Sequence, residues 1–135
     1  MYKKFLIPVA LDGQRDFAHQ FRVAEALSGE GSKYTILHVI EQIPSHIEAL
    51  IPETVRAAAR NEAKMELKEA SEKLEGASSV LLSGHAGRSI VDYATKHSMD
   101  CIIVASHVPV VSDVLLGSTA SWIVRHAKCA VHVIR

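Results

Sequence analysis

Five short apolar segments recur along the 135-residue chain and predict the strands of one sheet. The first is apolar on both faces, which is typical of a central parallel strand covered by helices on each side. It ends at Asp12-Gly13, a turn signal. The predicted strands are residues 5–11, 34–40, 79–83, 101–106 and 130–134.

Stretches with helical spacing separate these strands. Phe17, Phe21, Ala24 and Leu27 share one helical face, and the two glycines after it, Gly29 and Gly31, are expected to end that helix. A long charged helix opens at Pro52 and runs to about residue 74, since proline is favoured in a first helical turn. Shorter helices are expected around residues 90–94 and from residue 117, and tight connections at residues 84–87 and 41–51.

Strict alternation of strands and helices predicts a single-domain α/β fold, an open five-stranded parallel sheet with helices on both faces. Ligands of such sheets bind beyond the carboxyl ends of the strands, where the strand order reverses. With the first strand central, that crevice lies between the first and fourth strands. We expect the binding site there.

Composition narrows the classes of partner. Hydrophobic residues make up 48% of the chain and charged residues 22%, and 15 basic residues balance 15 acidic ones. This balance argues against a nucleic-acid or membrane-surface partner. The apolar segments are shorter than the roughly 20 residues of a membrane span, and two cysteines without a C-x-x-C pair suit the reducing cytoplasm. The eight histidines show no metal-ligand spacing, so no metal site is expected in the protein itself.

Gly117-Ser118-Thr119 marks the start of the last helix and is the strongest local signal for a ligand. Free N–H groups and the positive dipole end of a helix attract anions, and Gly117 lets the backbone approach a phosphate closely. The alternative is a plain helix start with Ser118 as the N-cap.

The stretch IIVASHVPVVSDVLLGSTASWIVRHAKCAVHVIR, residues 102–135, resembles the C-terminal signature of the universal stress protein family. The start MYKKFLIPVALDG resembles the family's opening strand, and Leu37-His38-Val39 its second. The resemblance covers residues 1–135 and implies a universal stress protein domain. It also implies strand order 3-2-1-4-5, the adenine nucleotide alpha hydrolase-like fold.

The nucleotide loop departs from the family's usual G-x-x-G pattern, because Ala105 and Val108 replace its glycines. One subgroup of the family has the motif A/G-S-x-x-P followed by L-L-G-S-N, and this chain is more similar to that subgroup. Ala105, Ser106, Pro109 and residues 115–118 match it, and Thr119 replaces the asparagine.

The resemblance implies a site for ATP, AMP or ADP, with Mg²⁺ beside the phosphates. Adenine would lie against the first two strands, at Pro8, Val9, Asp12 and Val39. The phosphate loop would comprise Ala105, Ser106, His107, Pro109, Gly117, Ser118 and Thr119. Asp12 stands two residues after the family's usual aspartate position, which is Ala10 here, and a simple turn role is its alternative.

The expected function is regulatory adenine-nucleotide binding in a stress response, without strong catalysis. Two alternatives stay open: a slow ATPase or autophosphorylating protein, and a nucleotide-free dimeric interaction module. The last strand ends the chain at a sheet edge, and the resemblance implies a homodimer through it. The apolar residues of the 42–51 segment can cover a ligand or a partner subunit.

Overall fold

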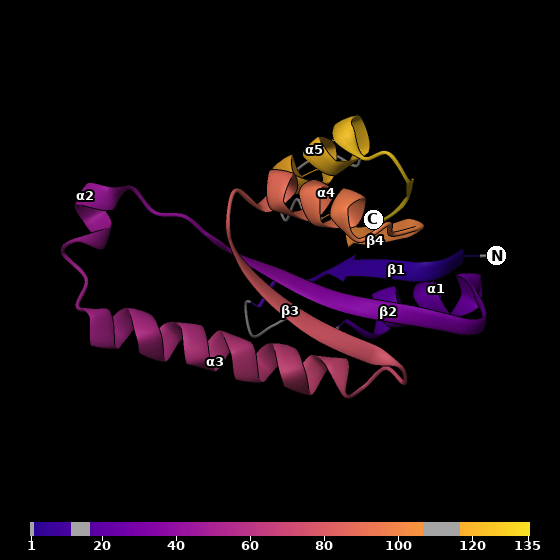
Figure 1. Ribbon diagram of the computed structural model, residues 1–135, viewed down its shortest axis with the longest axis horizontal. Helices are drawn as coiled ribbons and strands as arrows, with labels where there is room; N and C mark the ends of the chain where they lie inside the picture. The colour runs from indigo at the N-terminus through magenta and orange to yellow at the C-terminus, as the bar shows by residue number, and fades with distance from the viewer. Residues whose placement is uncertain (1, 12–16, 107–116) are drawn as a thin grey trace.

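The computed structural model describes residues 2–11, 17–106 and 117–135, and within them the chain forms one open parallel sheet (Figure 1). The strand order is β3-β2-β1-β4-β5, which confirms the expected order 3-2-1-4-5. Each neighbouring pair is parallel. The strands are β1 (Tyr2–Pro8), β2 (Ser28–Glu41), β3 (Ala77–Gly84), β4 (Cys101–Ala105) and β5 (Ala130–Ile134).

Helices cover both faces of the sheet, as predicted. One apolar cluster joins the sheet to α1 (Ala18–Leu27) and α3 (Glu53–Ser71), and the other joins it to α4 (Ala86–Lys96) and α5 (Ser118–His126). Figure 1 shows α4 and α5 on the side of the sheet opposite α3. A short helix, α2 (Ser45–Glu48), lies in the segment expected as a loop. No helix among the described residues is long and apolar enough to cross a membrane.

The structure corrects several predicted boundaries. β1 begins at Tyr2 and ends at Pro8, three residues earlier than expected. β2 begins at Ser28, so the two glycines expected to end α1 lie inside a strand instead. The β1–β2 register jumps from Tyr2↔Ser28 to Lys4↔Lys33, which leaves extra residues in β2 as a bulge. Gly31 adopts φ +79° in that bulge, a conformation that glycine accepts without strain.

Asp100 ties β1 to the start of β4. Its carboxylate accepts hydrogen bonds from the backbone N–H groups of Lys3 and Lys4, each at 2.9 Å. These bonds hold the pKa of Asp100 below its ordinary value, because they favour the charged form. The two central strands are therefore joined at the amino end of the sheet.

Gln20 joins the same two strands near their carboxyl ends. Its side-chain amide donates to the carbonyl oxygens of Pro8 at 3.0 Å and Ile103 at 3.2 Å. Gln20 is only 5% exposed and projects from α1 into an otherwise apolar layer. It satisfies two carbonyl groups that strand pairing leaves open, since the β1–β4 ladder extends only to Leu6↔Ile102.

The α4–α5 contact depends on a glycine. Gly87, expected in the turn before the helix, is the second residue of α4 and is buried against Trp122 of α5. The Arg88 guanidinium lies 5.5 Å from the centre of the Trp122 ring, and the His126 ring stacks on Trp122 with the ring centres 4.0 Å apart. Trp122 thus fixes the position of α5 relative to α4.

We expect Gly87→Ala to destabilise the fold by about 1–3 kcal/mol, because a Cβ there would lie 2.6 Å from Trp122. Alanine is otherwise better than glycine in a helix by about 1 kcal/mol. Urea unfolding would measure the change. In a Trp122→Gly background the Cβ, Cγ and Cδ1 atoms that the new methyl group would meet are all absent, so the same substitution should then be neutral or stabilising. Equal losses in both backgrounds would contradict the packing role.

We expect Gln20→Leu to lower the free energy of unfolding by about 1–3 kcal/mol, because it leaves two buried carbonyl oxygens without a donor. The exposed Gln42 provides a matched control, and Gln42→Leu should change the free energy by less than about 0.5 kcal/mol. Urea unfolding measures both variants. Equal stability of the two variants would show that Gln20 does not hold the strands together.

Candidate functional site

A cavity of about 290 Å³ lies at the carboxyl ends of β1, β2 and β4, beside the start of α5. This is the edge of the sheet where the sequence predicts the crevice. Seven of the predicted site residues line it: Pro8, Val9, Val39, Ala105, Gly117, Ser118 and Thr119. The other lining residues are Ala10, Leu37, His38, Glu41, Ala86, Ile90, Val104 and Ala120.

Four predicted residues are not among those lining the cavity. Ser106 lies next to it and accepts a hydrogen bond at its side-chain oxygen from the backbone N–H of Gly117, at 3.3 Å. Asp12, His107 and Pro109 lie outside the described residues.

Just after β1, both backbone groups of Val9 bond to β2 and fix this wall of the cavity. Its N–H donates to the Leu37 carbonyl oxygen at 2.9 Å, and its carbonyl oxygen accepts from Nδ1 of His38 at 2.8 Å. A carbonyl group can only accept, so the proton of this histidine lies on Nδ1. The sequence predicts a structural or surface role for His38 but gives no sign of this contact, which depends on the parallel pairing of β1 with β2.

The start of α5 presents free backbone donors to the cavity. The first helical bond runs from the Ser121 N–H to the Gly117 carbonyl oxygen, at 2.9 Å. The N–H groups of residues 118–120 precede that bond and have no partner within the helix. Gly117 is the N-cap residue, so the alternative that Ser118 is the N-cap is wrong. Among the described residues, no side chain caps this end.

Glu41 adds a negative charge to the opposite side of the cavity. It ends β2, two residues after Val39, and therefore lies on the same face of the strand. Among the described lining residues it is the one acidic group. A ligand here meets donors and a positive dipole end at α5, apolar walls, and a carboxylate at β2. Sequence reasoning missed Glu41, because its strand was predicted to end one residue earlier.

The site contains no ready-made metal centre in the part of the chain that is described. No group of three or more His, Cys, Asp or Glu side chains there is arranged to hold an ion. A cation would have to be bound mainly by the ligand itself, as Mg²⁺ commonly is by phosphates.

Known proteins share both sequence and fold with this chain. Universal stress protein A homolog 2 of Coxiella burnetii is 29% identical over 139 residues, which cover 99% of this chain and 95% of that protein. The hypothetical protein MJ0577, a test case of structural genomics, has a TM-score of 0.82 at 24% identity and covers 99% and 96% of the two chains. Universal stress protein UspA of Lactobacillus plantarum has a TM-score of 0.72 at 24% identity, covering 99% and 98%.

Two more distant structures of the same fold contain an adenine nucleotide. The universal stress protein of Archaeoglobus fulgidus in complex with dAMP has a TM-score of 0.67 at 15% identity, covering 99% of this chain and 98% of that one. The Arabidopsis thaliana family protein with AMP bound has a TM-score of 0.65 at 20% identity, covering 98% and 90%.

The family model described as "Universal stress protein family" matches residues 1–135. The match covers the whole chain. The sheet of this protein also has the strand order that the resemblance implied. The chain belongs to the universal stress protein family.

Proposed function

We propose that this protein binds an adenine nucleotide in the cavity between β1, β2, β4 and α5, and acts as a regulatory nucleotide-binding protein in a stress response. The observation that carries this proposal is the start of α5, where backbone N–H groups that have no partner within the described part of the chain adjoin a cavity with largely apolar walls. Such a combination suits a ligand with one anionic end and one flat, weakly polar end.

The phosphates would lie at the start of α5. The N–H groups of Ser118 and Thr119 and the positive end of the helix dipole favour an anion there. The hydroxyl groups of both residues can donate further hydrogen bonds. Gly117 has no side chain to keep a phosphate away from the backbone, and Ala105 presents only a methyl group from the end of β4.

Adenine would lie against the carboxyl ends of β1 and β2. Pro8, Val9 and Val39 supply an apolar surface there, together with backbone groups that can bond to the base. Related structures hold AMP, dAMP or cAMP, which supports an adenine base as the common element. Asp12, His107 and Pro109 would complete the site from the loops after β1 and β4.

ATP with Mg²⁺ is the form we propose, because the ion would neutralise the charge that the phosphates bring into the cavity. The role is regulatory and not strongly catalytic. Among the described lining residues, only His38 and Glu41 have side chains of the kinds that commonly act as a general acid or base, and Nδ1 of His38 is already bonded to Val9.

The cytoplasm is the location we propose. Cys101 and Cys129 are free thiols, which suits a reducing compartment. Burial raises the pKa of Cys101 to about 11 and also raises that of Cys129, so both stay protonated and poorly reactive.

Calorimetric titration with Mg-ATP tests the binding site. Thr119→Glu should weaken binding by about tenfold or more, because its carboxylate would repel phosphate at the cavity wall. The new charge suits the start of a helix, so the fold should be kept. Ser121→Glu, on the same helix but outside the cavity lining, is the matched control and should bind like the wild type. If the wild type shows no binding at millimolar Mg-ATP, the proposal fails.

We also propose a homodimer through β5. This strand pairs with β4 on one side and lies at the edge of the sheet, with its other side unpaired within the described chain. Val131 and Val133 are only partly buried there. Antiparallel pairing of two such edges around a two-fold axis would satisfy the open backbone groups of both copies.

His132→Glu should weaken that dimer, because the central residue of β5 would face its own copy across the axis and place two carboxylates together. His19→Glu, at an exposed position on α1, introduces the same charge away from the edge and serves as control. Sedimentation velocity should show a loss of β5-mediated association in the first variant alone. Identical behaviour of the two variants would exclude β5 pairing.

A further inference from the structure

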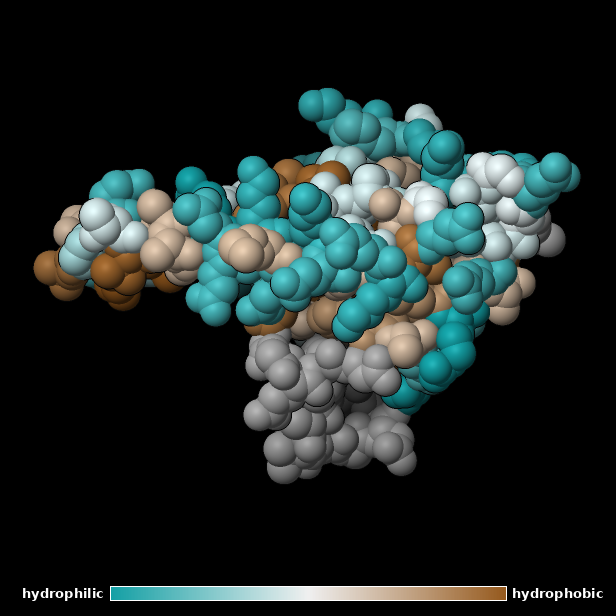
Figure 2. Space-filling model, turned by 90° about the horizontal axis from the view of Figure 1, so that it is seen from below, coloured by the Kyte–Doolittle hydropathy of each residue, from teal (hydrophilic) through white to brown (hydrophobic). Residues whose placement is uncertain are grey.

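Residues 42–63 form an arm that consists of the segment after β2, helix α2 and the first half of α3. Figure 1 shows this arm extending beyond the end of the sheet, and Figure 2 shows hydrophobic residues gathered at its tip. Leu50 is 82% exposed, although leucine is usually buried. The other large apolar side chains exposed on the arm are Ile43, Ile47 and Val55.

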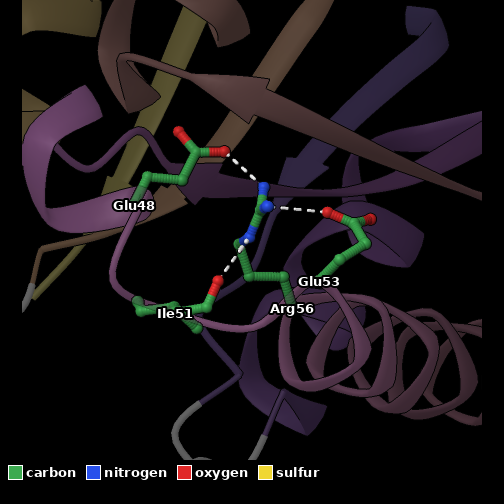
Figure 3. A network of polar contacts seen from close by, with 4 residues as sticks. All are labelled: Glu48, Ile51, Glu53 and Arg56. Atoms are coloured by element: carbon green, nitrogen blue, oxygen red, sulfur yellow. Dashed lines mark hydrogen bonds and ion pairs between the residues drawn. The ribbon is translucent and has the colours of Figure 1, made fainter.

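The arm is held in one arrangement by Arg56 (Figure 3). Its guanidinium contacts Glu48 at 2.7 Å and Glu53 at 2.7 Å, and its Nε donates to the Ile51 carbonyl oxygen at 3.3 Å. One side chain therefore links α2, the connecting turn and the start of α3. The exposed apolar residues are pre-ordered, which lowers the entropic cost of covering them.

The side of α3 that packs on the sheet in its second half continues into the arm, where no described residue covers it. Leu67, Ala70 and Leu74 are buried against the sheet. One and two turns upstream, Ala63 and Ala59 occupy the same side of the helix but face a cavity of about 430 Å³. Its other lining residues are Ile40, Glu41, Gln42, Ile43, Glu48, Arg56, Arg60 and Ser83.

We propose that the arm is an isologous interface, which a second copy of this chain covers with its own arm. The arm carries both parts of a self-complementary contact: an exposed apolar side chain, Leu50, and a cavity at its base whose walls include Ile40, Ile43, Ala59 and Ala63. In a two-fold interface, Leu50 of each copy would enter the cavity of the other copy. The chain has a net charge of zero, so long-range repulsion does not oppose pairing.

Charge complementarity supports a second copy as the occupant. If the starts of two α3 helices pair antiparallel about an axis near Ala57, Glu53 of each copy lies opposite Arg60 of the other. The same register brings Leu50 opposite Ala63, which lines the cavity. On the side of α3 that faces the cavity, Ala59 and Ala63 are four residues apart and carry only methyl side chains, which leaves room for a side chain of the other copy.

This interface lies away from β5, although Glu41 lines both its cavity and the proposed nucleotide cavity. The arm extends from β2 and α3, beside edge strand β3, whereas β5 is the opposite edge of the sheet. The experiment therefore uses the full chain with His132→Glu, in which β5 pairing is disfavoured. Association is measured without added nucleotide, so a failure of the nucleotide proposal would leave this result unchanged.

Sedimentation equilibrium of that protein measures the association. Leu50→Asp should raise the dissociation constant by about tenfold or more, because it removes the large apolar side chain that the contact would bury. Met65→Asp is the matched control: Met65 is 65% exposed on α3 but lies off the stripe that faces the cavity, and association should be unchanged. Equal dissociation constants for the two variants, or a parent that remains monomeric at its highest soluble concentration, would overturn the proposal.

A second pair of variants tests the charge register. Arg60→Glu would face Glu53 of the other copy and should weaken association by several-fold, more at low salt than at high salt. Asn61→Glu adds a negative charge one residue along the helix, away from the cavity lining, and should have no such effect. Association that is equally strong in both would exclude the antiparallel register.

Discussion

The site depends on the way β1 parts from β4. β1 pairs with β2 as far as Pro8↔Leu37, but its pairing with β4 ends at Leu6↔Ile102. Beyond that point the strands separate, and their carbonyl groups lose their strand partners. Gln20 bonds to the carbonyl groups of Pro8 and Ile103 and so makes the separation tolerable in a buried layer. Without such a donor, the opening would cost free energy at every unsatisfied oxygen.

The opening brings together groups that are far apart in sequence. The start of α5 comes to the cavity because α5 packs on α4 through Gly87 and Trp122. Glu41 reaches it because β2 is the longest strand and runs past the end of β1. The cavity is therefore polar at two sides with opposite sign and apolar between them. This polarity distinguishes one end of a ligand from the other without any contact to a specific base.

The sequence was sufficient for features that repeat locally. Alternating apolar runs and helical periods predict the parallel sheet, and the Gly117-Ser118-Thr119 signal predicts a helix start at the cavity. The bulge before Tyr34 was missed because its glycines are equally typical of a helix end. Gln20 and His38 were missed as positioning residues because each acts on a carbonyl group of another strand, and a single sequence does not contain that pairing. The placement of Asp12, His107 and Pro109 remains a prediction.

The arm cannot be explained by its own polar contacts. The ion pairs of Arg56 are partly exposed, and such pairs contribute only about 0–1 kcal/mol each. Burying one leucine side chain is worth about 1.5–3 kcal/mol. The Arg56 contacts therefore account for the shape of the arm but not for the exposure of Leu50 at its tip. What would stabilise that arrangement is burial, and the stripe of α3 that already packs on the sheet continues toward the arm's open cavity. The exposure of Leu50 is therefore best explained by the arm of a second copy, which would bury it.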